Sequence, residues 1–221
     1  NSTGTGEGIY WKYESFLKKM ESSFYTVVGA AGELFAFRRS LFVLIDETSL
    51  TDDFYLSLSI NLQHKIIAYA PGAVGSEKAS PTYNDEWKRK VRIAAGGFQS
   101  LFLLPGALNV LKHPLLAFQF FSHRVLRWVA CAPSLIFLFL LNVWMFVSGT
   151  ATFYEFTFYI QLLIYAGATL GAFLPANFLR LSVFNLPYYF VFMHAAMLAG
   201  AYRFLKGSQS VLWEKAARSV E

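Results

Sequence analysis

Residues 51–60 read TDDFYLSLSI and residues 88–93 read KRKVRI. The apolar residues of the first string recur at helical spacing, so we expect a helix that begins at its two carboxylates. In the second string Arg89 and Arg92 lie one turn apart on one side of a basic helix that starts near residue 84. An acid pair, a guanidinium cluster and a hydrophobic half of the chain therefore follow one another. This order decides the fold and the function that we expect.

The N-terminal part of the chain alternates between helical and extended patterns. Residues 9–24 have the spacing of an amphipathic surface helix. Residues 24–37 and 65–70 are rich in small, β-branched and aromatic side chains bounded by Gly or Pro, which predicts buried strands. Helices that alternate with strands indicate an α/β layer, so we expect residues 1–97 to form part of an α/β domain.

The C-terminal part has the composition of a membrane protein. The chain is 55% hydrophobic and only 15% charged, and most of its charges lie before residue 129. Three runs, 129–148, 154–175 and 185–205, are each long enough to cross a bilayer as a helix. The alternative, core helices of a soluble protein, requires polar faces that these runs lack.

Residues 98–128 are expected to form interfacial amphipathic helices, because Pro and Gly interrupt their apolar sequence. No acidic residue lies between Lys88 and Arg127, and the net charge of the chain is +5. Such a basic block suits anionic lipid head groups or phosphorylated substrates, whereas the predicted spans argue against nucleic acid as a partner. Its last part, residues 122–128, is expected to form a positive and aromatic collar on the cytoplasmic side of the first span.

These motifs and their order resemble the C-terminal catalytic half of membrane-embedded family-2 glycosyltransferases, the superfamily of the cellulose and hyaluronan synthases. In that family a Thr-Glu-Asp motif ends with the catalytic base, and a Gln-x-x-Arg-Trp motif, interfacial helices and membrane spans follow. The strings at 7–14 and 37–39 are also similar to those of smaller bacterial members. The resemblance implies a partial Rossmann-like (GT-A) domain, followed by interfacial helices and an all-α transmembrane region.

Asp53 matches the family's base by position, and Asp52 matches the Glu before it. Inverting glycosyl transfer needs a carboxylate that takes the proton from the acceptor hydroxyl as the hydroxyl attacks the anomeric carbon. The alternative is that both carboxylates only stabilise a helix N-terminus through its dipole.

Arg92 matches the motif arginine, and the resemblance implies that its guanidinium binds the nucleotide diphosphate. Arg89 stands where the family has Gln and Ile93 where it has Trp, so transfer of a single sugar is favoured over processive polymerisation. A basic helix that faces solvent or lipid is the alternative. Residues 124–128, RVLRW, imitate the same motif, but their position next to the first span favours the collar.

Gly29 and Ala30 belong to the string GAAG at residues 29–32. In the family this segment corresponds to a small-residue strand end near the acceptor. Small residues would let a sugar approach the backbone. Close packing between a helix and a strand explains them equally well.

The resemblance also implies a divalent metal ion. The family's donor half carries an Asp-x-Asp metal site, and no Asp-x-Asp occurs in these 221 residues. We therefore expect Mg or Mn to be bound by an upstream segment and no metal to be bound by residues 1–221. By itself this chain is expected to be an inactive fragment that lacks the donor-binding and metal-binding half.

The sequence thus predicts four parts: residues 1–97 of a catalytic domain, interfacial helices in 98–128, about three membrane helices in 129–206, and a polar tail at 207–221. The predicted function is that of an inverting, hexosyltransferase-type glycosyltransferase of the bacterial inner membrane with its catalytic part in the cytoplasm. It would transfer a sugar from a nucleotide-sugar donor to a lipid-linked or glycan acceptor, in contact with membrane lipids. A non-catalytic membrane module of a polysaccharide synthesis or export system is the alternative. The sequence defines neither the donor sugar, nor the acceptor, nor the oligomeric state.

Overall fold

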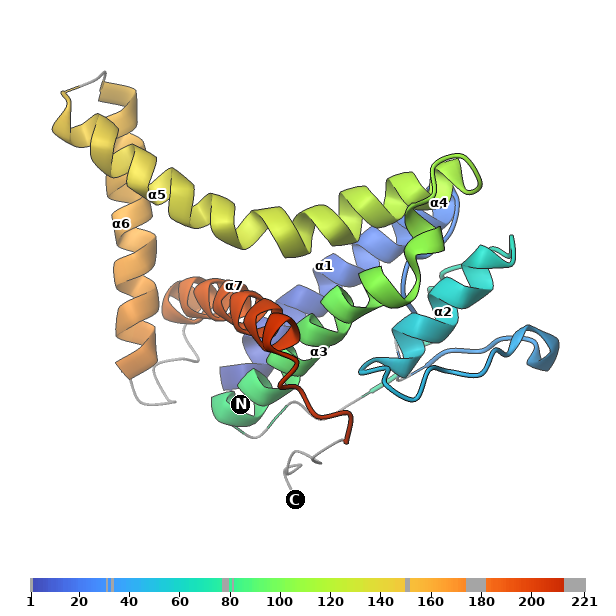
Figure 1. The fold of residues 1–221 in the computed structure, drawn as a ribbon. Helices are drawn as coiled ribbons and strands as arrows, with labels where there is room; N and C mark the ends of the chain where they lie inside the picture. Colours follow the sequence, from blue (N-terminus) through green and yellow to red (C-terminus); the bar gives the residue numbers. More distant parts are fainter. Residues whose placement is uncertain are drawn as a thin grey trace.

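The structure is a computed structural model that describes residues 2–30, 32, 34–76, 80, 82–149, 152–173 and 182–212. Its α-helices are α1 (Ser2–Phe24), α2 (Asp52–Leu62), α3 (Tyr83–Leu103), α4 (Pro114–Gln119), α5 (Ala132–Val147), α6 (Thr152–Phe173) and α7 (Ser182–Lys206) (Figure 1). Short 3-10 turns lie at Arg39–Leu41 and Pro105–Leu108. Two π-helical turns, Phe120–Val125 and Arg127–Cys131, join α4 to α5.

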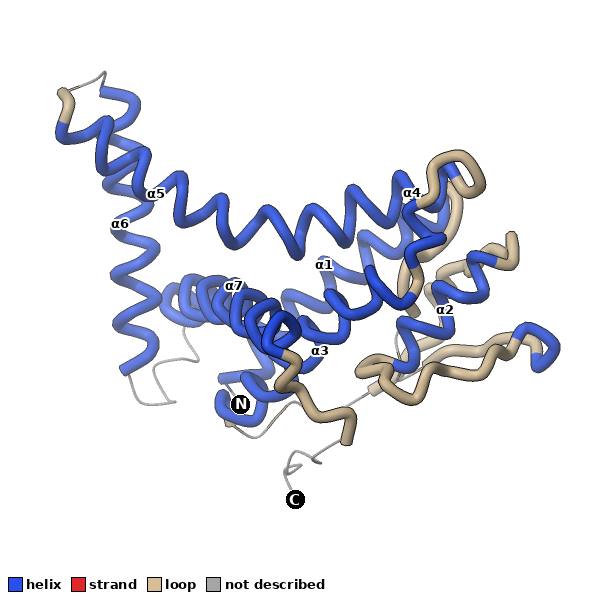
Figure 2. Tube along the Cα trace, in the orientation of Figure 1, coloured by secondary structure: helices blue, strands red, loops and turns tan. Residues whose placement is uncertain are grey.

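The predicted α/β fold is wrong for the described residues, which form helices and loops and contain no β-strand (Figure 2). The predicted strands at 24–37 and 65–70, and with them the partial Rossmann-like layer in residues 1–97, are replaced largely by loop. A hydrogen bond of 2.9 Å from the Val27 amide to the Ile67 carbonyl joins the two loops. A sheet requires a ladder of such bonds between neighbouring strands, and the described part of the chain forms none here. Composition thus predicted strands, whereas these segments form loops that no sheet connects in the described structure.

The three helices that the sequence predicted before residue 98 are confirmed. They are α1, α2 and α3, although α1 begins before and α3 ends after the predicted ranges. Thr51 precedes α2 in an extended conformation, and both carboxylates lie in the first turn of α2. At the start of α3 the Thr82 hydroxyl accepts a hydrogen bond of 3.1 Å from the Asp85 amide, which caps the helix.

The core lies where α2, the end of α3 and the π-helical turns meet. Its buried side chains come from widely separated parts of the chain: Val28, Leu58, Leu104, Ala107, Leu116, Phe120 and Trp128. Phe120 is fully buried, and its ring centroid lies 6.0 Å from that of Phe54 and 6.3 Å from that of Trp128. The segment expected to lie in the membrane interface therefore supplies much of the core.

In the described part of the chain, two helices are long and apolar enough to cross a membrane. One runs unbroken through α4, both π-helical turns and α5, from Pro114 to Val147, and the other is α6 (Figure 1). They cover residues 129–147 of the first predicted span and 154–173 of the second, and residues 174 and 175 lie outside the described part of the chain. The third predicted run lies in α7, which is not among the candidate spans in the described part of the chain.

Helix α7 packs along α3, and the two helices run in the same direction. Tyr83 near the start of α3 contacts Tyr188 of α7, while Phe98 and Phe102 near its end contact Phe204. Between these points the helices approach closely at Gly200. A Cβ atom on Gly200 would lie 2.4 Å from the Cβ of Ala94 on α3. This contact leaves no space for a side chain and fixes α7 against the helix that positions the candidate site.

We expect Gly200→Ala and Gly8→Ala to change stability in opposite directions. The added methyl group at Gly200 overlaps α3 and should destabilise the fold by about 1–3 kcal/mol. At Gly8 in α1 no atom lies within 4 Å of the added Cβ. There the better helix propensity of Ala should leave stability unchanged or raise it by up to about 1 kcal/mol. Thermal unfolding of both variants in detergent measures the difference, and equal effects would contradict the close approach of α3 and α7.

Candidate functional site

The predicted base, Asp53, lies in the first turn of α2. Helix α2 lies against Gly29, Ala30 and Gly32, which we call the glycine segment. A Cβ atom on Gly32 would lie 3.1 Å from the Asp53 Oδ2 atom, so the carboxylate contacts the backbone there. Gly29 has a φ of +89°, and a Cβ on it would lie 2.6 Å from the Phe54 ring. Both the left-handed backbone and the contact require glycine at this position. The structure therefore places Gly29 beside the helix that carries Asp53.

Ala30 is held against the same helix. Its amide donates a hydrogen bond of 3.1 Å to the hydroxyl of Ser57, one turn after Asp53 on α2. The Ser57 hydroxyl in turn donates to the Phe54 carbonyl at 3.0 Å. The predicted residues Gly29, Ala30 and Asp53 thus come together. These contacts also agree with the packing alternative for the small residues.

Helix α3 fixes the start of α2 from the other side. A Cβ on Gly96 would lie 2.5 Å from Cγ2 of Thr51, so α3 and the start of α2 are in direct contact. The Gln99 side chain accepts a hydrogen bond from the Leu50 amide at 2.9 Å and donates one to the Thr48 carbonyl at 2.7 Å. The loop before α2 therefore has no freedom to move the acid pair away from α3.

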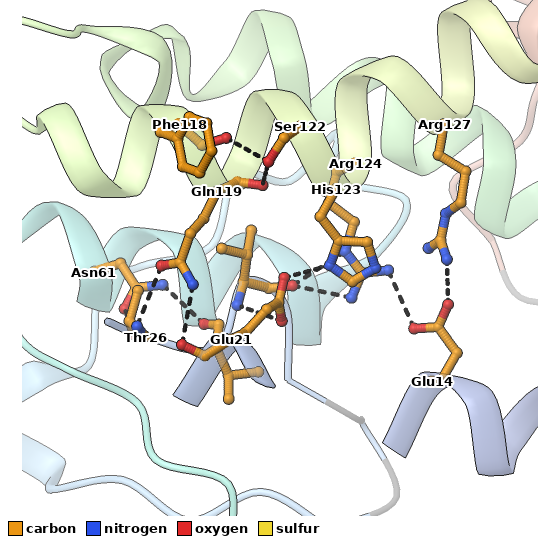
Figure 3. Close-up of polar contacts among 12 residues, drawn as sticks. Glu14, Glu21, Thr26, Asn61, Phe118, Gln119, Ser122, His123, Arg124 and Arg127 are labelled. Carbon is orange, nitrogen blue, oxygen red and sulfur yellow. Dashed lines mark hydrogen bonds and ion pairs between the residues drawn. The ribbon is translucent and has the colours of Figure 1, made fainter. Parts of the chain in front are cut away.

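The π-helical segment holds the backbone just before Gly29. Arg124 is buried, and its Nε and one terminal nitrogen both donate to the Val28 carbonyl, at 3.1 and 3.0 Å (Figure 3). Its other terminal nitrogen lies 3.5 Å from a carboxylate oxygen of Glu14 on α1. One guanidinium therefore connects α1, the glycine segment and the candidate span.

Two carboxylates on α1 complete this buried charge cluster. Glu14 also pairs with Arg127, and Glu21 pairs with His123 (Figure 3). Burial alone would raise the pKa of Glu14, but the Arg124 and Arg127 guanidinium groups outweigh burial and lower this pKa to about 2. Glu14 is therefore ionised at neutral pH, and its charge is balanced by the two arginines.

Uncharged polar side chains hold the rest of the segment. The Thr26 amide donates to Gln119 of α4 at 3.2 Å, and the Val27 carbonyl accepts from Asn61 of α2 at 3.1 Å (Figure 3). The Val28 amide donates to the Glu21 carboxylate at 3.3 Å. Hydrogen bonds from three helices thus fix an irregular loop, which explains how it keeps a defined shape without a sheet.

Trp128, one π-helical turn beyond Arg124, packs into the core between α2 and α3. Its ring centroid lies 5.6 Å from that of Phe54, and a Cβ on Gly97 would lie 2.9 Å from the indole. The residue is only 8% exposed. In this structure Trp128 therefore positions α2 and α3 and does not present its face to a ligand.

Arg92 and Arg89 lie on α3 but have different partners. The Arg92 guanidinium donates to the carbonyls of Ser210, Val211 and Leu212, at 2.8, 2.7 and 3.2 Å. Burial lowers the pKa of Arg92 below its usual range, and the charge of Asp52 acts in the opposite direction, so Asp52 and Arg92 are electrostatic neighbours.

Arg89 instead pairs with Glu86, one turn earlier on α3. Its Nε lies 3.1 Å from a carboxylate oxygen of Glu86, which also pairs with Lys90 at 3.3 Å. Burial would raise the pKa of Glu86, but Lys90 and Arg89 lower it. Arg89 thus compensates a buried carboxylate on its own helix.

The string RVLRW at 124–128 supplies the guanidinium and indole that lie beside the Asp53 helix. The sequence predicted a positive and aromatic collar at the cytoplasmic end of the first span here, and Arg124 and Trp128 do not fit that role because both are buried in the protein. The string ends in Arg127 and Trp128, the same pair that ends the Gln-x-x-Arg-Trp motif. This pair was the sequence signal that the string belongs to the site. The buried partners Glu14 and Glu21 had no comparable signal, because they read as the polar face of a surface helix.

A large cavity adjoins the glycine segment. It has a volume of about 1370 Å³, and its lining includes Ala30 and Leu34, which flank Gly32 in the sequence. Three basic residues, Lys18, Arg38 and Lys65, line the cavity, and none of the described residues of its lining is acidic. The described lining therefore suits an anionic ligand and lies next to the backbone that Asp53 contacts.

The described residues offer no complete metal site. Among them, no three or more His, Cys, Asp or Glu side chains are grouped closely enough to hold a metal ion. The paired Asp52 and Asp53 alone do not provide the ligand set that Mg or Mn prefers. We therefore assign no chemical step to a metal.

A helix-borne carboxylate, a glycine segment and an adjacent basic cavity define a site suited to proton abstraction beside an anionic ligand. The chain matches the sequence model of the family described as Glycosyl transferase family group 2 over residues 12–204, and it belongs to that family. It is thus a family-2 glycosyltransferase chain, which implies a sugar donor and an acceptor. Searches of curated proteins and of solved structures returned no match.

The Glu14 cluster predicts a specific acid sensitivity. Because the pKa of Glu14 is lowered from 4.5 to about 2, the unfolded state binds a proton in that range that the folded state does not. The stability that Glu14 contributes is therefore complete above pH 4.5 and is lost as the pH falls toward 2. Glu14→Gln should remove this part of the acid dependence and, at neutral pH, destabilise the fold by about 3–5 kcal/mol, because the buried Arg124 and the partly exposed Arg127 lose their partner.

Unfolding temperatures of the wild type and Glu14→Gln between about pH 7 and pH 3 measure this effect. Glu47→Gln, at an exposed position in the loop before α2, is the matched control and should follow the wild type. Parallel curves for wild type and Glu14→Gln would contradict the assignment.

Proposed function

We propose that this chain carries the acceptor-activating side of the active site of an inverting glycosyltransferase that uses a nucleotide-sugar donor. The observation that supports this most strongly is the position of Asp53. Its carboxylate lies at a helix N-terminus against the backbone at Gly32, and Ala30 and Leu34 on either side of Gly32 line the cavity with the basic residues. Family membership establishes glycosyl transfer in general.

In the proposed reaction Asp53 accepts the proton of the acceptor hydroxyl. The hydroxyl oxygen forms a bond to the anomeric carbon as the bond from that carbon to the diphosphate breaks. The nucleoside diphosphate leaves with the electron pair, and the anomeric configuration inverts. The carboxylate suits this task because the glycine backbone beside it lets a sugar approach closely.

The basic cavity is the place that we propose for the anionic part of the donor. Lys18, Arg38 and Lys65 provide positive charge, and Trp11 and Tyr69 provide aromatic surface in the same lining. A nucleoside diphosphate combines a flat base with two phosphates, so both features match it. Mg or Mn remains part of the proposal only as an ion that residues outside the described site would bind.

Arg92 remains a predicted diphosphate ligand, but in this structure its guanidinium is already bonded to other groups. Its guanidinium is bonded to three carbonyls of the segment after α7. Binding a diphosphate would require Arg92 to exchange these carbonyls for phosphate oxygens. The charge of the neighbouring Asp52 would oppose the approach of a diphosphate from that side.

The membrane setting is also part of the proposal. Two helices meet the length and composition of membrane spans, and the first of them carries Arg124 directly into the site. An acceptor at the membrane surface would thus meet Asp53 close to where the chain enters the bilayer. A bacterial inner membrane with the site in the cytoplasm, where nucleotide sugars are made, is consistent with this placement.

The decisive variant is Asp53→Asn, which keeps the shape of the side chain and removes its basicity. Because general-base catalysis contributes roughly 100-fold to 10,000-fold, transfer should fall by about that factor. Transfer is measured in membranes that contain the intact protein, with a panel of radiolabelled nucleotide sugars. Binding of the nucleotide sugar that is active with the wild type should change little.

Glu47→Gln makes the same carboxylate-to-amide change in the exposed loop that precedes α2 and should retain full activity. If Asp53→Asn folds normally and retains its turnover, Asp53 is not the base. Transfer with retention of the anomeric configuration would likewise exclude the proposed single displacement.

A further inference from the structure

An uncharged groove lies at the N-terminal end of α3. The contact of α3 with the start of α2, between Gly96 and Thr51, lies further along the same helix. The groove has a volume of about 690 Å³ and is formed by the first turns of α3, the second half of α6 and the middle of α7. Its lining is dominated by aromatic rings and small side chains, among them Tyr83, Trp87, Tyr165, Tyr188, Phe192 and Ala172. None of the described residues that line the groove is charged. A ligand of this groove must therefore be largely apolar.

The aromatic wall of the groove is built by fixed contacts between rings. Tyr83 meets Tyr188 edge to face at a centroid distance of 4.8 Å, and Trp87 meets Phe192 in the same way at 5.5 Å. Such pairs are favourable beyond the area that they bury. The groove is thus a preformed surface on which an extended hydrocarbon chain can lie.

The groove is continuous with the outer surface of a candidate membrane span. Ala168, Thr169 and Ala172 of α6 line it, and the next side chains on that helix, Leu170 and Phe173, are 55% and 85% exposed. Helix α6 is long and apolar enough to cross a bilayer. A lipid chain could therefore enter the groove sideways from the membrane without passing through water.

Positive charge begins where the groove ends and continues toward the acid pair. Asn84 lines the groove, and Lys88 and Arg92 follow one and two turns later on the same side of α3. At about 1.5 Å per residue, the axial distance from Asn84 to Arg92 is about 12 Å. Lys88 is exposed, and Arg92 is the electrostatic neighbour of Asp52.

We infer that this groove binds the hydrocarbon chain of a lipid-phosphate-linked acceptor and that Lys88 contacts the phosphate. The inference rests on the proposed function and selects the lipid-linked acceptor over a free glycan. An apolar chain matches the uncharged lining, an anionic phosphate matches Lys88, and the acceptor hydroxyl beyond the phosphate extends toward Asp53. A free glycan has no part that requires an uncharged groove at the surface of a membrane span.

The test uses a diazirine-bearing tetradecyl phosphate as a photoreactive probe on the full chain in neutral phosphatidylcholine nanodiscs. Crosslinked peptides are mapped by mass spectrometry, and labelling is competed with tetradecyl phosphate, tetradecanol or inorganic phosphate. We expect labels on the first turns of α3 and the middle of α7. Tetradecyl phosphate should compete at least about tenfold better than tetradecanol, because a hydrogen bond to a charged group is worth that factor or more.

Two variants and one matched control test the residues. Ala172→Trp fills the groove at an exposed position and should abolish the specific labelling, whereas Ala166→Trp, exposed elsewhere on α6, should leave it unchanged. Lys88→Gln should retain labelling but make tetradecanol and tetradecyl phosphate compete equally. Labels spread evenly over the spans, or unaffected by Ala172→Trp, would overturn the groove as a site. Equal competition by tetradecanol or by inorganic phosphate in the wild type would overturn the assigned ligand.

The two proposals fail in distinguishable ways. The crosslinking assay needs no transfer, so Asp53→Asn should label normally. If Asp53→Asn loses transfer while labelling ignores Ala172→Trp, the glycosyltransferase site stands and the groove inference fails. If the groove labels specifically while Asp53→Asn keeps its turnover, the groove binds the lipid phosphate but the proposed base is wrong.

Discussion

The contact on which the rest of the site depends is that of the buried Arg124 guanidinium with Glu14 and with the Val28 carbonyl. It connects three parts of the chain that are far apart in sequence: α1, the segment before Gly29 and the first candidate span. A buried charge that loses its partner costs about 3–5 kcal/mol, so none of these parts can move without the others. This contact fixes the Val28 carbonyl directly before the left-handed turn at Gly29, and Ala30 next to it is bonded to Ser57 of α2.

The π-helical turns explain how one helix can both supply Arg124 and continue as a membrane span. A π-helical turn contains more residues than an α-helical turn and often marks a functional position. Here the widened turns direct His123, Arg124 and Arg127 toward the carboxylates of α1, while Trp128 packs against α2 and α3. The helix then becomes regular at Ala132 and carries no charged side chain as far as Val147. If α5 spans a bilayer, the same helix links the site directly to the membrane.

The sequence predicted the helices better than it predicted the contacts between residues that are far apart in the chain. Periodicity located α1, α2 and α3, and composition located the two candidate spans, because both signals depend on near neighbours. The strands failed because pairing depends on distant segments. The motif Arg was placed at Arg92 because that position follows Asp53 at a family-like interval, whereas the Asp53 helix packs against RVLRW, much further along the chain. A buried arginine is recognisable only once its carboxylate is known, and Glu14 looked like a solvent-facing residue.

The central claim is that Arg124 holds residues 26–30 in place beside the Asp53 helix. The most direct measurement is hydrogen exchange of the amides in this segment, in the wild type and in Arg124→Lys. Although the segment is irregular, the amides of Thr26, Val27, Val28 and Ala30 donate to partners on separate parts of the fold. We expect protection comparable to that of α2 in the wild type and its selective loss in Arg124→Lys, whose side chain cannot make the paired bonds to Val28. Fast exchange in the wild type, or equal protection in the variant, would contradict it.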